Sequence, residues 1–370
     1  MDGEVFQDLK DIEEEQKNVL DDAGADETSA PQTYNISSYG ADFDVDGLVK
    51  RMNRGDIFIP PFQRDYVWNL SDASRFIESL LLGLPVPGIF LAKDPDSNKS
   101  LVIDGQQRLK SLQFFYDGYF NPKPDQKTRR VFKLLNVQPQ FEGKTFEALD
   151  EKDKVRLNDS IVHATVIKQE SPEGDDTSVY HVFERLNAGG RKLMPQEIRT
   201  AIFHGTLIEL LRQLNTTAEW RAIFGKESNR LKDQELILRF LAMYFTRLDY
   251  AKPMSEFLNK FSKKNRNPDQ AFTEQCAQLF VKTIRVVHQA IGNEAFRPER
   301  ALNAAVFDSV MVGLAKRLDI GENISLDAVK ATYDALLAAP EFKAATSDST
   351  SDVNNVSNRL NLAITRFATI

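Results

Sequence analysis

The sequence contains few of the residue types that build disulfides and metal clusters. It has one cysteine, Cys276, and four histidines among 370 residues. A single cysteine excludes an internal disulfide and a cysteine-rich zinc site. It is typical of a reducing compartment, so we expect a cytoplasmic protein. No apolar run approaches the roughly 20 residues that span a bilayer, and the acidic N-terminus lacks the basic and apolar regions of a signal peptide, so we expect no membrane partner.

Net charge is also small once the N-terminus is set aside. The whole chain carries −7, whereas residues 1–35 hold eleven acidic residues and two lysines, a net of −9, which leaves +2 for the remainder. The overall charge therefore neither favours nor excludes a nucleic-acid partner. We expect residues 1–35 to form a mobile acidic tail. An intersubunit clasp and a mimic of nucleic-acid charge are the alternatives.

Hydrophobic periodicity predicts a compact mixed α/β unit in the first half of the chain. Strands are expected at 34–39, 57–59, 88–92, 101–103 and 163–168, and helices at 45–53, 71–82, 108–117 and 146–158. Asp44 is the expected N-cap of the first helix, and Ser71 or Asp72 that of the second.

From Ser178 onward the periodicity is helical, without internal repeats. Helices are expected at 207–214, 232–247, 254–263, 272–291, 302–317, 326–338 and 354–367, with a mobile Ser/Asp/Thr-rich segment at 345–353. We therefore predict an α+β protein, with a mixed α/β domain at 36–170 followed by an all-helical domain at 171–370.

One stretch gathers an acid, two amides and a guanidinium within five residues. An apolar run leads into Asp104 and Gly105, and Gln106, Gln107 and Arg108 follow at the start of a helix. The carboxyl end of a strand that opens onto a helix N-terminus is a common place for anionic ligands. A carboxylate there can bind Mg²⁺ or act as a general base, and a guanidinium suits phosphate oxygens. The plain alternatives are a simple turn and a solvated helix start.

A second polar cluster comes earlier in the same unit. Gln63 and Arg64 follow a proline pair and repeat the combination of amide and guanidinium. Tyr66 and Trp68 lie on the same side of an extended chain, where they can stack on a base or sugar, or cover a core. We interpret the two clusters as halves of one phosphate-handling site.

Two weaker features lie further along the chain. Asn187 opens the segment Asn-Ala-Gly-Gly, which ends one helix before Pro195 begins the next. This segment is either a plain joint between helices or a loop that closes over the ligand. A basic patch is a candidate for DNA contacts or a solvated face, and it comprises Lys260, Lys263, Lys264 and Arg266.

Four separated motifs, in this order, resemble the DGQQR-motif domain of the GmrSD type IV restriction enzymes and of the phosphorothioate-sensing SspE effector. They are Ile-Pro-Pro-Phe-Gln-Arg-Asp-Tyr-Val-Trp at 59–68, the helix and loop at 76–87, Asp-Gly-Gln-Gln-Arg-Leu at 104–109, and Phe-Glu-Arg-Leu-Asn-Ala-Gly-Gly at 183–190. The match covers roughly residues 45–205 and is specific, because four motifs agree in order.

The resemblance implies a ParB/sulfiredoxin-like fold for the first domain and defence against foreign, often modified, DNA. It also implies binding and hydrolysis of a nucleoside triphosphate with Mg²⁺ at the DGQQR corner. Asp104, Gln107 and Arg108 are then the expected catalytic residues, with Asp104 also the metal ligand. The expected nucleotide-binding residues are Gln63, Arg64, Tyr66, Trp68, Gly105, Gln106 and Asn187.

One departure from the family pattern concerns DNA cleavage. Family members that cut DNA often add an HNH nuclease domain, which needs a histidine base close to metal-binding residues. Here the histidines are scattered, at positions 163, 181, 204 and 288. A separate nuclease subunit is therefore an expected partner, unless the protein senses without cutting. The alternatives are a ParB-like DNA-nicking endonuclease and a non-catalytic, nucleotide-switched binding module. Formation of a homo-oligomer stays open.

Overall fold

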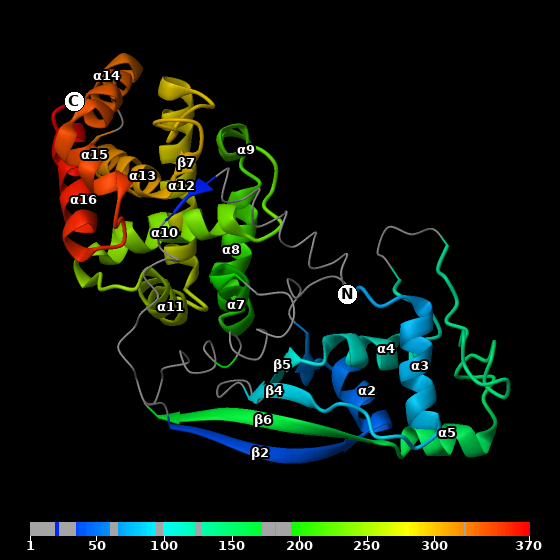
Figure 1. Ribbon diagram of the computed structural model, residues 1–370. Helices are drawn as coiled ribbons and strands as arrows, with labels where there is room; N and C mark the ends of the chain where they lie inside the picture. The colour runs from blue at the N-terminus through cyan, green and yellow to red at the C-terminus, as the bar shows by residue number, and fades with distance from the viewer. Residues whose placement is uncertain are drawn as a thin grey trace. The chain divides into compact units, whose positions relative to one another are not determined.

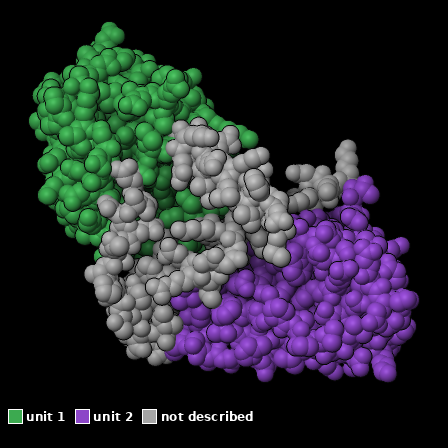
Figure 2. Space-filling model, viewed as in Figure 1, with its two compact units in different colours: residues 1–32, 190–370 green, residues 33–189 purple. Residues whose placement is uncertain are grey.

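The computed structural model describes residues 19–21, 35–59, 66–93, 99–122, 128–171, 182, 194–321 and 323–370. The chain divides into two compact units, shown in Figure 2. The sheet unit comprises Thr33–Gly189, and the helical unit comprises Met1–Gln32 with Gly190–Ile370. A small sheet in one unit and mostly helices in the other confirm the predicted α+β class. The more specific ParB-like fold stays a prediction.

A five-stranded mixed sheet forms one layer of the sheet unit (Figure 1). Its order is β2 (Asn35–Asp44), β6 (Ile161–Ser171), β4 (Ile89–Lys93), β5 (Ser100–Asp104) and β3 (Ile57–Phe58). The pairs β2–β6 and β4–β5 are antiparallel, whereas β6–β4 and β5–β3 are parallel. The five expected strands are thus confirmed. β2 and β6 run longer than expected because they pair from Asp44 opposite Ile161 to Asn35 opposite Ser171.

Helices α2, α3 and α4 lie on one side of this sheet in Figure 1. The helices of the unit are α2 (Val45–Asn53), α3 (Leu70–Leu81), α4 (Gln106–Asp117) and α5 (Glu151–Asn158). Asp44 caps α2 as predicted, since its carboxylate accepts from the Gly47 amide at 2.6 Å. The predicted cap of α3 is wrong. Asn69 accepts from the Asp72 amide at 2.9 Å, so the helix begins two residues earlier than Ser71 would allow.

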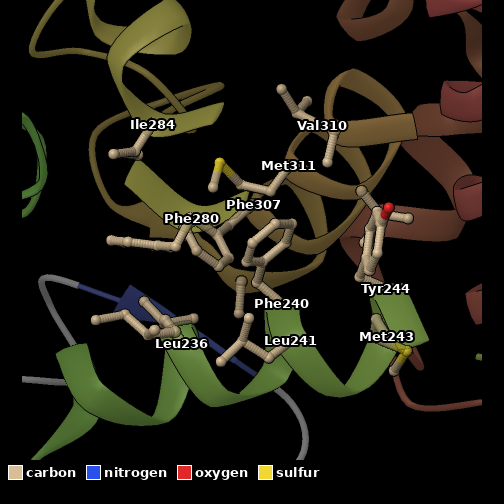
Figure 3. Packing of buried hydrophobic residues seen from close by; sticks show 14 of the residues in the cluster. Leu236, Phe240, Leu241, Met243, Tyr244, Phe280, Ile284, Phe307, Val310 and Met311 are labelled. Carbon is tan, nitrogen blue, oxygen red and sulfur yellow. The ribbon is translucent and has the colours of Figure 1, made fainter. Parts of the chain in front are cut away.

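The helical unit is organised around α10 and α13, which are buried on nearly all sides. Burial on nearly all sides places these two helices in the interior of the unit. Figure 3 shows Phe240 and Leu241 of α10 facing Phe280 of α12 and Phe307 and Met311 of α13. The helices are α7 (Pro195–Ile202), α8 (Thr206–Asn215), α9 (Ala218–Phe224), α10 (Lys232–Thr246), α11 (Met254–Lys264), α12 (Gln270–Ile291), α13 (Ala304–Ile320), α14 (Leu326–Ala338), α15 (Pro340–Ser347) and α16 (Val353–Phe367).

Beside its helices, the unit contains one short parallel pairing between the two-residue strands β1 (Val19–Leu20) and β7 (Leu302–Asn303). One expectation for this unit needs correction. Residues 345–353 are not a mobile segment. They include the end of α15, and Arg359 donates to the Thr350 carbonyl and anchors the turn that follows. Among the described residues no helix is long and apolar enough to cross a bilayer.

Of the predicted acidic tail, the structure describes residues 19–21 and Asn35, the first residue of β2, and these differ from the expected mobility. Val19 is buried in the core of the helical unit. The Asp21 carboxylate lies 2.5 Å from Lys232 Nζ and 2.7 Å from Arg239 Nη1. Asp21 therefore contributes counter-charge to these two cations of α10, together with Glu235 beside Lys232 and Asp308 beside Arg239. This short piece of the N-terminus is therefore part of the folded helical unit.

Candidate functional site

The candidate site begins at the sharp corner between β5 and α4. β5 ends at Asp104, Gly105 adopts the left-handed conformation with φ of 100°, and α4 starts at Gln106. A Cβ added at Gly105 would come within 2.5 Å of Ile89 Cγ2. Both the backbone angle and the close approach therefore require glycine. No side chain caps the N-terminus of α4 in the described part of the chain, and backbone amides at a helix start are potential donors for an anion.

Asp104 and Arg108 form an ion pair across this corner. The Asp104 Oδ2 atom lies 2.8 Å from Arg108 Nη2, one helical turn further on. The side chain of Asp104 is 50% exposed and that of Arg108 16% exposed. Arg108 Nε is buried and makes no hydrogen bond within the described part of the chain. The acid and the guanidinium predicted to share a site thus do so, with the carboxylate open to solvent.

Gln107 ties the second cluster to the corner. Its side-chain oxygen accepts hydrogen bonds from the backbone amides of Val67 at 3.0 Å and Trp68 at 3.2 Å. Gln107 and Gln106 are both buried. The contact shown for Gln107 is that of a positioning residue. Its predicted catalytic role, and the nucleotide-binding role of Gln106, stay predictions.

Tyr66 lies in the core beside α4. It is 6% exposed, and its ring packs edge-on against Phe114 at 5.0 Å and Phe120 at 5.7 Å. Its hydroxyl lies 2.7 Å from Ser111 Oγ, which itself donates to the Gln107 carbonyl, so Tyr66 is the donor to Ser111. Burial raises the pKa of Tyr66 to about 12, which keeps the hydroxyl protonated.

Trp68 is also packed rather than free. Its ring lies edge-on to Phe76 of α3 at 5.7 Å and is partly buried against the core. Both aromatic rings therefore take the core-covering role that the sequence left open. Stacking on a base stays a prediction for both. Ser111 escaped the sequence analysis because a serine within an apolar helix gives no signal until its tyrosine partner is placed.

Three predicted nucleotide-binding residues lie outside the described residues, namely Gln63, Arg64 and Asn187. The described chain resumes at Tyr66, two residues after Arg64, and Gln107 holds the next two residues to α4. The end of the second cluster thus lies next to the corner. The predicted convergence of Gln63 and Arg64 with this corner falls outside the described residues and stays a prediction.

The predicted DNA-contact patch is divided in the structure. Lys260 and Lys264 at the end of α11 are exposed, whereas Lys263 and Arg266 are partly buried. Arg266 Nε donates to the His204 carbonyl at 2.9 Å. DNA contact by these four residues stays a prediction, and the exposed pair is the part open to a ligand.

The described histidines have separate partners. His163 bonds Asp42 at 2.8 Å, His204 lies 3.6 Å from Glu209, and His288 bonds the Asn293 side chain at 3.0 Å. His181 lies outside the described residues. Within the described ranges no group of three His, Cys, Asp or Glu side chains is placed to hold a metal ion.

Comparison with known families gives a match to part of the chain. The model of the GmrSD restriction endonuclease N-terminal domain matches residues 45–204. This range runs from α2 to α7. It contains the Asp104–Arg108 corner and every strand of the five-stranded sheet except β2. No curated protein matches the chain. Residues 45–204 are thus similar to the N-terminal domain of the GmrSD type IV restriction enzymes, and this similarity supports a restriction-like DNA-defence protein.

Proposed function

We propose that the Asp104–Arg108 corner binds and hydrolyses a nucleoside triphosphate within a DNA-defence protein. The observation that carries the proposal is the ion pair at an uncapped helix N-terminus, with the carboxylate half exposed and the guanidinium held beneath it. In many proteins, backbone amides at a helix start and a planar guanidinium fork bind phosphate oxygens.

The residues present fit a magnesium–nucleotide complex. Mg²⁺ typically uses one or two carboxylates together with substrate phosphates and water, and does not need a cage of protein ligands. Asp104 offers one exposed carboxylate at the corner. The lack of a three-residue cluster among the described residues therefore does not argue against the proposal. Bound Mg²⁺ would supply neutralisation of phosphate charge at this position.

The protein groups then have distinct roles. Arg108 and the first amides of α4 hold the phosphate oxygens. Arg108 has more hydrogen-bond donors for phosphate when its Nη2 atom no longer donates to Asp104. The Asp104 carboxylate accepts a proton from a water molecule whose oxygen bonds to the terminal phosphorus. The bond between this phosphorus and the bridging oxygen breaks, and the nucleoside diphosphate leaves with that oxygen. Gln107 keeps the chain that follows Arg64 against α4.

The proposal is tested by the turnover of purified full-length protein on each common nucleoside triphosphate, with and without DNA. We expect phosphate release with Mg²⁺ and none after chelation by EDTA, because charge neutralisation is lost. Failure to bind any nucleotide by calorimetry would contradict the assignment. Tight binding without turnover would instead favour a nucleotide-switched module, and DNA dependence would link the two activities.

A second candidate is DNA nicking by the same acid. The family match is to a restriction endonuclease, and an exposed carboxylate can equally hold a metal ion for phosphodiester cleavage. Incubation of supercoiled plasmid with Mg²⁺ or Mn²⁺ separates the two candidates. Open-circular product that disappears in an Asp104→Ala variant would favour nicking, and intact plasmid alongside nucleotide turnover would favour hydrolysis.

A further inference from the structure

The sheet unit contains a second pocket, at the opposite end of β5 from Asp104. Its volume is about 520 Å³, within the range of small-ligand sites. Ser100, the first residue of β5, lines it, so the pocket lies roughly 13 Å along the strand from the corner at about 3.3 Å per residue. The proposed nucleotide hydrolysis does not use this pocket.

The pocket is lined by residues from most of the curved sheet. Tyr39, Ala41 and Phe43 alternate along β2 and therefore share one face. Tyr39 pairs with Val166 of β6, which lines the same pocket. Lys93 of β4 and Ser100 of β5 are paired residues as well. The lining is thus built by strand register and does not depend on a single loop.

Among the described residues that line the pocket, cations outnumber anions. Arg51, Lys93 and Lys99 contribute three positive charges, and Asp56 contributes one negative charge. Asp56 is already paired with Arg54, whose Nη2 and Nε atoms lie 2.9 and 3.0 Å from its carboxylate. Arg54 does not line the pocket, so the negative charge is offset from outside. The pocket therefore favours an anion.

Aromatic surface accompanies these cations. Tyr39 is 51% exposed. The Arg51 guanidinium lies over the Phe43 ring, 5.6 Å from its centroid, which places a cation beside the aromatic wall. An exposed ring next to a cationic groove is the combination that single-stranded nucleic acid requires, because bases stack while cations follow the phosphates.

We propose that this pocket binds one unpaired nucleotide of a DNA strand, with its base on Tyr39 and its phosphates near Arg51, Lys93 and Lys99. The inference rests on the DNA role of the proposed function and not on nucleotide hydrolysis. A pocket of this volume holds one nucleotide but not a duplex. It would give the protein a DNA contact separate from the corner that handles the triphosphate.

The test is fluorescence anisotropy of the full-length protein with a labelled single-stranded oligonucleotide, over a series of salt concentrations. Tyr39→Ala is expected to weaken binding by about 10-fold, through lost stacking. Arg51→Gln should weaken binding and lower the slope of log affinity against log salt by about 1. Each variant is first shown by thermal melting to fold as the wild type does.

Matched controls lie outside the pocket. Lys50 stands beside Arg51 on α2, is exposed and pairs with Asp46, while Tyr119 is another exposed tyrosine. Lys50→Gln and Tyr119→Ala are expected to bind the oligonucleotide like wild type. Wild-type affinity in both pocket variants, or equal weakening in the controls, would overturn the proposal. So would competition by a free mononucleotide as strong as that by the oligonucleotide.

The two proposals fail separately. The pocket variants should keep the basal nucleotide turnover measured without DNA, and Asp104→Ala should keep oligonucleotide binding. Loss of DNA binding in the pocket variants of a protein that never hydrolyses nucleotide would uphold this inference and reject the hydrolysis. Turnover at the corner without any DNA effect of Tyr39→Ala would do the reverse.

Discussion

Replacement of Asp104 by alanine is expected to lower the rate of nucleotide hydrolysis by about 100-fold or more. The carboxylate is the described group at the corner that can accept a proton from water, and it is also the expected ligand of Mg²⁺. We expect the loss in kcat, because Arg108 and the amides of α4 still hold the phosphates. The measurement is steady-state phosphate release at saturating nucleotide, with KM from the same series.

The fold should survive this change. Asp104 is half exposed and the structure shows one ion pair for it, an arrangement that contributes about 0–1 kcal/mol. Asp46→Ala is the matched control, because Asp46 also pairs with a cation one helical turn away, Lys50, at 2.6 Å. Asp104→Asn keeps the shape without a basic carboxylate and should match Asp104→Ala. Hydrolysis by Asp104→Ala at the wild-type rate would reject Asp104 as the catalytic group.

Replacement of Asp308 by alanine is expected to destabilise the helical unit by about 3–5 kcal/mol. Asp308 on α13 is fully buried, and its carboxylate lies 2.6 Å from Arg239 Nη2 and 3.6 Å from Arg359 Nη2. Burial lowers the pKa of Arg359, which shows how costly its charge is without a counter-ion. Removal of the carboxylate would leave two buried guanidinium groups, with Asp21 beside Arg239 and backbone carbonyls beside Arg359.

The readout is denaturant unfolding followed by the fluorescence of Trp220. The chain has two tryptophans, and a Trp68→Phe background leaves Trp220 as the reporter of the helical unit. Trp220 is fully buried and its ring lies 5.4 Å from that of Phe307, the neighbour of Asp308. Asp334→Ala, which breaks an exposed pair with Lys330, is the control and should change stability by less than about 1 kcal/mol. A similarly small change in Asp308→Ala would show that the buried network contributes little.

Local signals predicted the elements around the site. Asp44 before an apolar-periodic run predicted α2, because capping depends on neighbours three residues apart. The short apolar runs of β4 and β5, bounded by turn residues, predicted those strands. The N-cap of α3 was harder to predict, because Asn69, Ser71 and Asp72 are all residue types that cap helices. Backbone geometry, not residue type, selects Asn69.

Long-range pairing could not be predicted from residue types alone. Asp21 becomes buried because it meets Lys232 and Arg239, more than two hundred residues away in the chain. The residue pattern of the acidic segment does not predict the contact of Asp21 with these two cations. The contacts of Gln107 could not be predicted either, because the sequence indicates a side chain that binds a ligand. In the structure it holds the backbone of Val67 and Trp68.

A structure of the full chain with Mg²⁺ and a non-hydrolysable nucleoside triphosphate analogue tests the central claim most directly. We predict phosphate oxygens within about 3.2 Å of Arg108 and of the first amides of α4, with the Asp104 carboxylate facing the metal ion. Gln63 and Arg64 should contact the same nucleotide. An analogue bound elsewhere at saturating concentration, with the Asp104–Arg108 pair intact, would contradict the assignment of this corner as the nucleotide site.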